Sequence, residues 1–162
     1  MRMRIGLNLF AIAAFITAVI ALPPITAAEV LVGVRGGVYE DKDAEDSNLL
    51  LAGAELVAPL GGKWWVNPNA EHRFDDTANV NTFSLDFHRD IDTASSLFLW
   101  LGGGPSLVHT NPDGPADAHS DVGGNALFGV GVKSKDVVPY MQAKALFLDE
   151  DNVLSLAAGI RF

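Results

Sequence analysis

From residue 30 onward the sequence is built from short segments in which apolar and polar side chains alternate. This alternation constrains the fold more than any other feature. Successive side chains of a β-strand point to opposite faces, so a period of two predicts strands with one apolar face. Eight such segments of about ten residues are separated by turn residues. They span residues 30–40, 49–60, 63–74, 80–90, 97–108, 124–133, 138–148 and 153–162.

The first 28 residues differ from the rest and resemble an export signal. Two arginines provide a positive start, the stretch 5–22 is almost entirely apolar, and small residues occupy 26–28. An uncleaved membrane anchor is the alternative. No later apolar run approaches the roughly 18 residues of a transmembrane helix. We therefore expect a cleaved signal peptide over 1–28 and one β-barrel domain over 29–162.

The connections between segments alternate in length. Residues 59–62, 90–96 and 134–137 form short connections, whereas 40–48, 75–79 and 109–123 are longer or more acidic. Bacterial outer-membrane barrels have short turns on the periplasmic side and long loops outside. An even strand number places both termini on one side. The pattern predicts an all-β fold, an eight-stranded antiparallel up-and-down transmembrane barrel.

Alternation alone does not say which face is outside, because a soluble lipocalin-like barrel shows the same period inverted. The last segment favours the membrane. Its apolar face consists of Leu154, Leu156, Ala158, Ile160 and Phe162. This pattern resembles the C-terminal assembly signal of bacterial outer-membrane barrels. Residues 64–69, 101–105 and 138–144 also resemble segments of the outer-membrane-protein-A and protein-X groups. The resemblance implies export to the bacterial outer membrane and insertion by the barrel assembly machinery.

The polar faces carry few charges, and these nearly balance. Arg35, Arg73, Lys144 and Arg161 stand against Glu55, Glu71 and Asp86. A narrow lumen must pair its charges, because an unpartnered buried ion costs several kcal/mol. We expect a polar network that fills the lumen, with Arg73 and Lys133 at a solvated rim. The network comprises Arg35, Glu55, Glu71, Asp86, His88, Lys144 and Arg161.

The opposite faces contain no charge, as contact with lipid requires, because one Arg or Lys at mid-bilayer costs about 2–4 kcal/mol. They include Val32, Val34, Val38, Leu50, Ala54, Leu56, Phe83, Leu85, Phe87, Phe128, Val130, Val132, Met141, Ala145 and Phe147. Trp64 suits an aromatic girdle, whereas Tyr140 points inward by phase. Pro68 and Pro105 imply a bulge or an early strand end. The apolar run around Trp100 leaves its face unassigned.

Most carboxylates fall in the longer connections. They are Glu40, Asp41, Asp43, Glu45, Asp46, Asp75, Asp76, Asp113, Asp117, Asp121, Asp149, Glu150 and Asp151. Such oxygen clusters suit hard divalent cations that bridge to anionic lipopolysaccharide. The simpler interpretation is solvated loops held apart by repulsion. The net charge of −9 argues against nucleic acid, and the absence of cysteine excludes disulfides and thiolate metal sites.

Catalysis has one geometric candidate. Ser84, Asp86 and His88 share a strand face, as a nucleophile, acid and base would. They point into the lumen, however, whereas a lipid-modifying site must face lipid. Ser106 and His109 fall on opposite faces, and His72 and His119 have no evident partner.

The sequence therefore favours a monomeric, non-enzymatic outer-membrane barrel without a cofactor or metal. Its expected role is structural or surface-interacting, with lipids and lipopolysaccharide as partners. A lipid A-modifying enzyme and a soluble periplasmic lipid-binding barrel remain alternatives.

Overall fold

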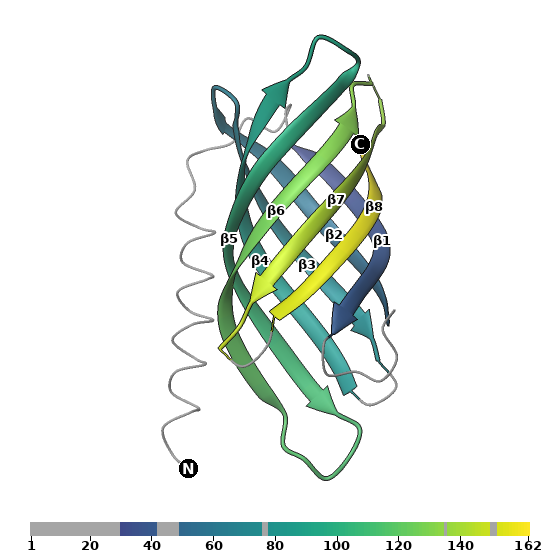
Figure 1. The fold of residues 1–162 in the computed structure, drawn as a ribbon, viewed down its shortest axis with the longest axis vertical. Helices are drawn as coiled ribbons and strands as arrows, with labels where there is room; N and C mark the ends of the chain where they lie inside the picture. The colour runs from purple at the N-terminus through teal and green to yellow at the C-terminus, as the bar shows by residue number, and fades with distance from the viewer. Residues whose placement is uncertain (1–29, 42–48, 76–77, 135, 150–151) are drawn as a thin grey trace.

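The computed structural model describes residues 30–41, 49–75, 78–134, 136–149 and 152–162. These residues form eight antiparallel strands, each paired with its neighbours in chain order, in a closed barrel (Figure 1). The strands are β1 (Leu31–Asp41), β2 (Leu49–Gly61), β3 (Trp64–Phe74), β4 (Ala78–Asp92), β5 (Leu97–Pro112), β6 (His119–Val132), β7 (Val138–Phe147) and β8 (Asn152–Arg161). No helix among these residues is long and apolar enough to span a membrane. The expected signal peptide lies outside the described residues.

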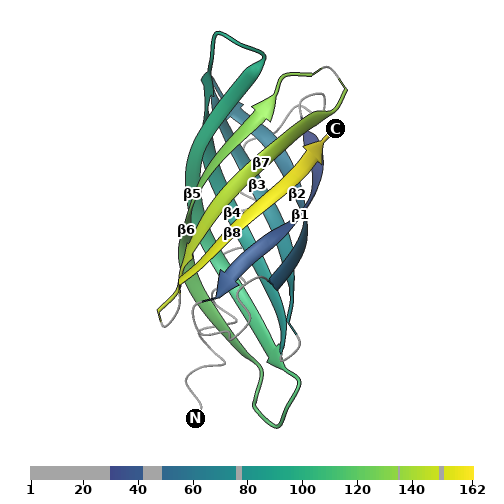
Figure 2. The same ribbon diagram turned by 45° about the vertical axis from the view of Figure 1, so that its right-hand side comes forward.

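The barrel closes where β1 pairs with β8, as Figure 2 shows from the side of these two strands. The pairing runs from Gly33 opposite Arg161 to Asp41 opposite Val153. Val32 and Phe162 complete it with two backbone hydrogen bonds of 2.9 Å each. We call the end where β1 begins and β8 finishes the terminal end, and the opposite end the loop end. The eight-stranded antiparallel barrel expected from the sequence is confirmed.

The period-two pattern sorts the side chains between the outside and the interior. Outward positions on every strand expose large apolar residues, among them Val34, Leu50, Leu101, Phe128 and Phe147. The charged residues that are buried occupy inward positions. Near the terminal end, the outward residues Ala58, Val66 and Leu85 are buried in an apolar cluster, so Leu85 is not among the exposed ones.

The β5–β6 hairpin is longer than the sequence pattern predicts. Cross-strand pairs continue to Thr110 opposite His119, so much of the expected loop 109–123 is strand. This part of both strands carries polar residues on both faces, and the apolar alternation that marks a strand is therefore absent. The hairpin projects beyond the other strands at the loop end (Figure 1).

Both prolines lie within continuous strands, so the expected bulge or early strand end is wrong. Pro68 lies opposite Leu85 and Pro105 opposite Gly124. Each proline instead interrupts the ladder on its other side without changing the register. The β2–β3 ladder has no pairs for Leu56 and Val57, and the β4–β5 ladder has none for Leu85 and Asp86. Proline lacks the N–H that a central strand donates, which accounts for both gaps.

Candidate functional site in the barrel interior

The middle of the interior is an alternating chain of positive and negative side chains. Glu55 joins Arg161 (Nε–Oε1 2.8 Å) to Arg35 (Nη1–Oε2 3.2 Å). Arg35 continues to Glu71 (Nη2–Oε1 3.0 Å), and Glu71 to Lys144 (Oε2–Nζ 3.3 Å). Lys144 ends the chain at Asp86 (Nζ–Oδ2 3.4 Å). Three cations thus neutralise three carboxylates in a space where an unpaired ion costs several kcal/mol.

Neutral polar residues provide further hydrogen bonds to these ions. Asn69 accepts hydrogen bonds from Arg35 (2.6 Å) and Lys144 (3.0 Å) and donates to Asp86 (2.8 Å). Asn67 donates to Glu55 (2.6 Å), and Asn125 donates to the other oxygen of Asp86 (2.6 Å). Such bonds matter because a buried polar group without a partner costs about 1–3 kcal/mol.

An aromatic layer closes the interior towards the terminal end. The Trp100 side chain is fully buried, and its ring centroid lies 5.8 Å from that of Tyr140. The Arg161 guanidinium lies over both rings, 4.7 Å from the Trp100 centroid and 4.4 Å from the Tyr140 centroid. A Cβ at Gly129 would collide with the Trp100 ring, and one at Gly159 with the Tyr140 ring. These two glycines therefore make room for the aromatic layer.

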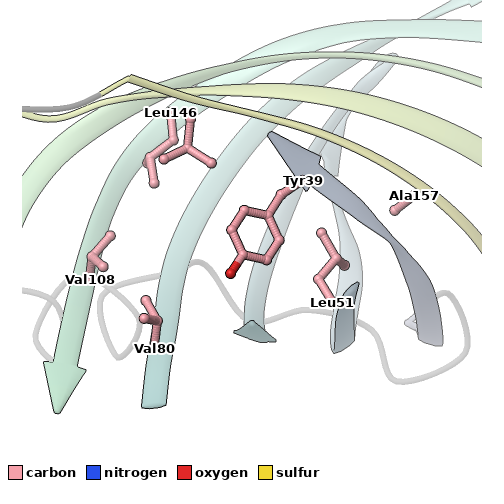
Figure 3. Packing of buried hydrophobic residues seen from close by; sticks show 7 residues of the cluster. Tyr39, Leu51, Val80, Val108, Leu146 and Ala157 are labelled. Atoms are coloured by element: carbon pink, nitrogen blue, oxygen red, sulfur yellow. The ribbon is translucent and has the colours of Figure 1, made fainter. Parts of the chain in front are cut away.

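An apolar layer closes the interior towards the loop end. It consists of Tyr39, Leu51, Val80, Val108, Leu146, Val153 and Ala157, which converge from six strands (Figure 3). Arg73 lies in this layer with its guanidinium 5.2 Å from the centre of the Tyr39 ring. Arg73 is 7% exposed, so its expected place at a solvated rim is wrong. A cavity of about 20 Å³ beside Arg73 and Lys144 has room for about one water molecule.

The seven residues proposed as a lumen network all lie inside the barrel and are buried. Six of them form the charged chain, and His88 does not join it. The His88 Nε2 atom instead lies 3.8 Å from Asp90 Oδ1, and its ring packs near Trp100. Lys133, the other expected rim residue, is exposed and pairs with Asp92 at 3.1 Å. The alternate residues Leu154 to Phe162 of the expected assembly signal all point outward and are exposed.

The catalytic candidates do not contact one another in a productive way. Ser84 bonds to Ser106 (2.8 Å) and accepts a hydrogen bond from Lys144 (3.1 Å). Asp86 is held by two asparagines and Lys144, and His88 faces Asp90. Ser106 is buried inside, whereas His109 is exposed on the outside, as their odd spacing predicts. Within the described ranges, no group of three metal-ligating side chains could hold a metal ion.

Several interior residues were not expected from the sequence. Charge balance does not identify the neutral residues Asn67, Asn69 and Asn125, although each alternates with charged or other inward residues along its strand. The apolar run around Trp100 also left the face of this residue unassigned. The inward glycines Gly129 and Gly131 could have given the phase, since crowded inward positions next to a large ring require small residues.

The outer wall carries a polar row near the loop end. His72, Asn81, His109 and Ser120 lie side by side on β3 to β6, because each is paired with the next. Two hydrogen bonds subdivide the row: His72 Nδ1 to Asn81 Oδ1 at 3.0 Å, and His109 Nδ1 to Ser120 Oγ at 2.9 Å. His72 thus has a partner that the sequence did not reveal. His119 also has one, with its Nε2 atom 3.5 Å from Asp121 Oδ2.

The expected acidic loops are described only in part. Glu40, Asp113, Asp117, Asp121 and Asp149 are exposed towards the loop end. Asp113 accepts a hydrogen bond from Asn79 at 3.1 Å. Asp43, Glu45, Asp46, Asp76, Glu150 and Asp151 lie outside the described residues.

Comparison with solved structures identifies small outer-membrane barrels as similar folds. Neisserial surface protein A matches with a TM-score of 0.66 and 14% identity, covering 82% of this chain and 95% of that one. The N-terminal β-barrel domain of Pseudomonas aeruginosa OprF gives 0.62 and 14%, covering 82% and 97%. The attachment invasion locus protein Ail of Yersinia pestis gives 0.58 and 13%, covering 82% and 96%. No family model matches the sequence, and no curated protein matches it. The expected resemblance to small outer-membrane barrels is confirmed at the level of the fold.

Proposed function

We propose that this chain is a non-enzymatic outer-membrane protein with a structural or surface-interaction role. The observation that carries the proposal is the distribution of side chains, which is the reverse of that in a soluble barrel. Six charged residues are paired in the interior, while residues such as Leu50, Phe128 and Leu154 are about half exposed on the outside. A water-facing surface is normally rich in charge, whereas a lipid-facing one must lack it.

The height of the apolar wall supports the same conclusion. On β3 it runs from Trp64, half exposed near the terminal end, to His72 in the polar row. With a tilt of about 40° and a rise of about 3.3 Å per residue, this segment spans about 20 Å of bilayer, close to the ~25 Å apolar band of such barrels. Trp64 then lies where an aromatic girdle is expected. The terminal end is periplasmic in this arrangement, and the loop end is extracellular.

Passive diffusion through the barrel is not part of the proposed role. The three interior layers leave a cavity of about 20 Å³ beside Arg73 and Lys144, which is far smaller than a solute path requires. A soluble lipid-binding barrel needs an apolar cavity where this one holds ions. The buried contacts of Ser84, Asp86 and His88 likewise provide no support for a lipid-modifying enzyme.

The proposed partners follow from the two ends of the barrel. Exposed carboxylates such as Asp113 and Asp117 would meet anionic lipopolysaccharide through divalent cations. The outward-facing end of β8, which finishes near Phe162, would be read by the barrel assembly machinery. The barrel would work as a monomer.

Membrane fractionation and refolding test the proposal. We expect the chain in the outer-membrane fraction, and the purified chain in detergent micelles should migrate differently before and after heating. Planar bilayers should show no porin-sized conductance. A chain that stays monomeric in water without any amphiphile would contradict the membrane assignment, and a change in lipid A mass on expression would contradict the non-enzymatic one.

A further inference from the structure

The outer wall contains an apolar groove across β1 to β4. It is a shallow, open hollow with a volume of about 320 Å³. The groove exists because small residues, Ala54, Pro68 and Ala70, lie between larger ones. Its apolar lining consists of Val32, Ala54, Leu56, Pro68, Ala70 and Phe83.

The groove lies over the interruption in the β2–β3 ladder. Pro68 lines it, and the unpaired stretch at Leu56 lies directly across from Pro68. Glu55 and Asn69 also line the groove, and both belong to the interior network. The ladder interruption and the hollow therefore coincide at one place in the wall.

The groove has a polar end on its loop-end side. His72 follows Ala70 by two residues, and Asn81 precedes Phe83 by two, so both lie on the same outer face directly beyond the groove. His72 Nδ1 and Asn81 Oδ1 are 3.0 Å apart. The amide oxygen only accepts, so the ring nitrogen donates. Within the part of the chain that the structure describes, the His72 Nε2 atom and the Asn81 amide NH₂ group have no other hydrogen-bond partner.

The second pair of the polar row provides a comparison on the same protein. His109 and Ser120 are also hydrogen bonded, at 2.9 Å. On the terminal-end side of the second pair the next outward positions hold Leu107 and Val122, whereas those next to His72 and Asn81 hold Ala70 and Phe83. Both positions beside the second pair are thus large, whereas the small Ala70 leaves the groove open beside the first.

We propose that the groove and the His72–Asn81 pair bind one acyl chain of lipopolysaccharide. The chain lies along Ala54, Pro68 and Ala70. At its head end an ester or amide carbonyl accepts from the Asn81 NH₂ group, or an amide N–H donates to His72 Nε2. The occupant is an amphiphile because the site is apolar along its length and polar at one end. The orientation of the site decides which leaflet of the membrane supplies the lipid. The polar end faces the loop end, and under the proposed function, on which this inference rests, the lipid with its head group on that side is lipopolysaccharide.

Photo-crosslinking tests this site on the full chain folded into vesicles of phospholipid and lipid A. The probe is lipid A with a diazirine in one acyl chain, and labelled peptides are mapped by mass spectrometry. We expect label on residues 50–56 and 66–74. Ala70→Phe fills the groove and should reduce this label about tenfold, as loss of an apolar contact worth about 1.4 kcal/mol would. The matched control is Ala126→Phe, at an exposed outward position on β6, which should leave it unchanged.

The polar end is tested with a second matched pair. His72→Leu should reduce the label about fivefold, the effect of losing one hydrogen bond of about 1 kcal/mol. His109→Leu removes the same side chain from the same row and should not change the label.

Equal loss of label with Ala70→Phe and Ala126→Phe would overturn the inference, and so would equal labelling by a diazirine phospholipid. Heat-modifiable migration of every variant is measured first. Failure of the wild-type chain to insert would refute the proposed function itself, and Ala54→Leu replaces Ala70→Phe if that variant does not fold.

Discussion

Replacing Glu55 with glutamine tests whether the interior charges hold the barrel together. Glu55 is 2% exposed and contacts both Arg35 and Arg161. In the variant, Arg35 keeps Glu71 and Asn69, whereas Arg161 loses its carboxylate partner and keeps its ring contacts with Trp100 and Tyr140. Removing one partner of a buried ion pair costs about 3–5 kcal/mol, so we expect a loss of that order in the free energy of unfolding.

Urea unfolding in detergent micelles measures this loss, with tryptophan fluorescence and the heat-modifiable band as readouts. Fluorescence is informative because the Trp100 ring lies against the Arg161 guanidinium. With a slope of about 2 kcal/mol per M of urea, a loss of about 4 kcal/mol lowers the midpoint by about 2 M. Glu40→Gln is the matched control, because Glu40 is exposed at the loop end. Its free energy of unfolding should stay within about 0.5 kcal/mol of that of the wild type.

A double variant separates lost pairing from lost packing. Glu55→Gln combined with Arg161→Met removes both charges of one pair. The double variant should therefore lose less free energy of unfolding than the two single variants lose together. The expected coupling is about 1–3 kcal/mol, the range for residues in one network. If Glu55→Gln lowers the free energy of unfolding no more than Glu40→Gln does, pairing of the interior charges does not stabilise the barrel.

Two further predictions concern the aromatic layer and the outer wall. Gly129→Ala should destabilise the barrel by about 1–3 kcal/mol, because its Cβ would meet the Trp100 ring. The control is Gly36→Ala, whose Cβ would have ordinary contacts. Equal urea midpoints for the two variants would disprove the packing of the aromatic layer. Phe128→Lys should lower the stability in vesicles by about 2–4 kcal/mol, because it places a charge on the apolar wall. The control is Asn111→Lys, at an exposed outward position beyond the polar row, which should change the stability little in the same unfolding assay. Similar losses of stability for the two variants would show that the wall does not face lipid.

The number, order and facing of the strands could be predicted because a period of two survives in the sequence. On most strands charged or polar residues alternate with apolar outward ones, so the inward positions of Arg35, Glu55 and Lys144 follow from counting alone. Closure also follows, since β1 and β8 otherwise leave unpaired edges. The ends of β5 and β6 could not be predicted, because the residues near Thr110 and His119 are polar on both faces.

The levels at which the inward side chains lie along the barrel axis, and the contacts between them, could not be predicted for a different reason. Alternation says that a side chain points inward but not at which level it meets others. The level depends on the tilt and stagger of the closed sheet. Arg73 therefore lies under the Tyr39 ring and not at a rim, and His88 lies beside Trp100 and not in the charged chain. The prolines show the same limit, because only the register reveals that the ladder skips Pro68 and resumes unchanged.

The order of the six charges has a consequence for how the barrel is completed. Neighbours in this series come from distant parts of the chain: Glu55 meets Arg161, 106 residues later, and Glu71 meets Lys144, 73 residues later. Strands β5 and β6 contribute none of the six. Of these six charges, a sheet of the first six strands would hold three carboxylates and only Arg35, with Arg73 as a second interior cation outside the series. Lys144 of β7 and Arg161 of β8 supply the missing cations, so closing the wall with these two strands is what neutralises the buried carboxylates.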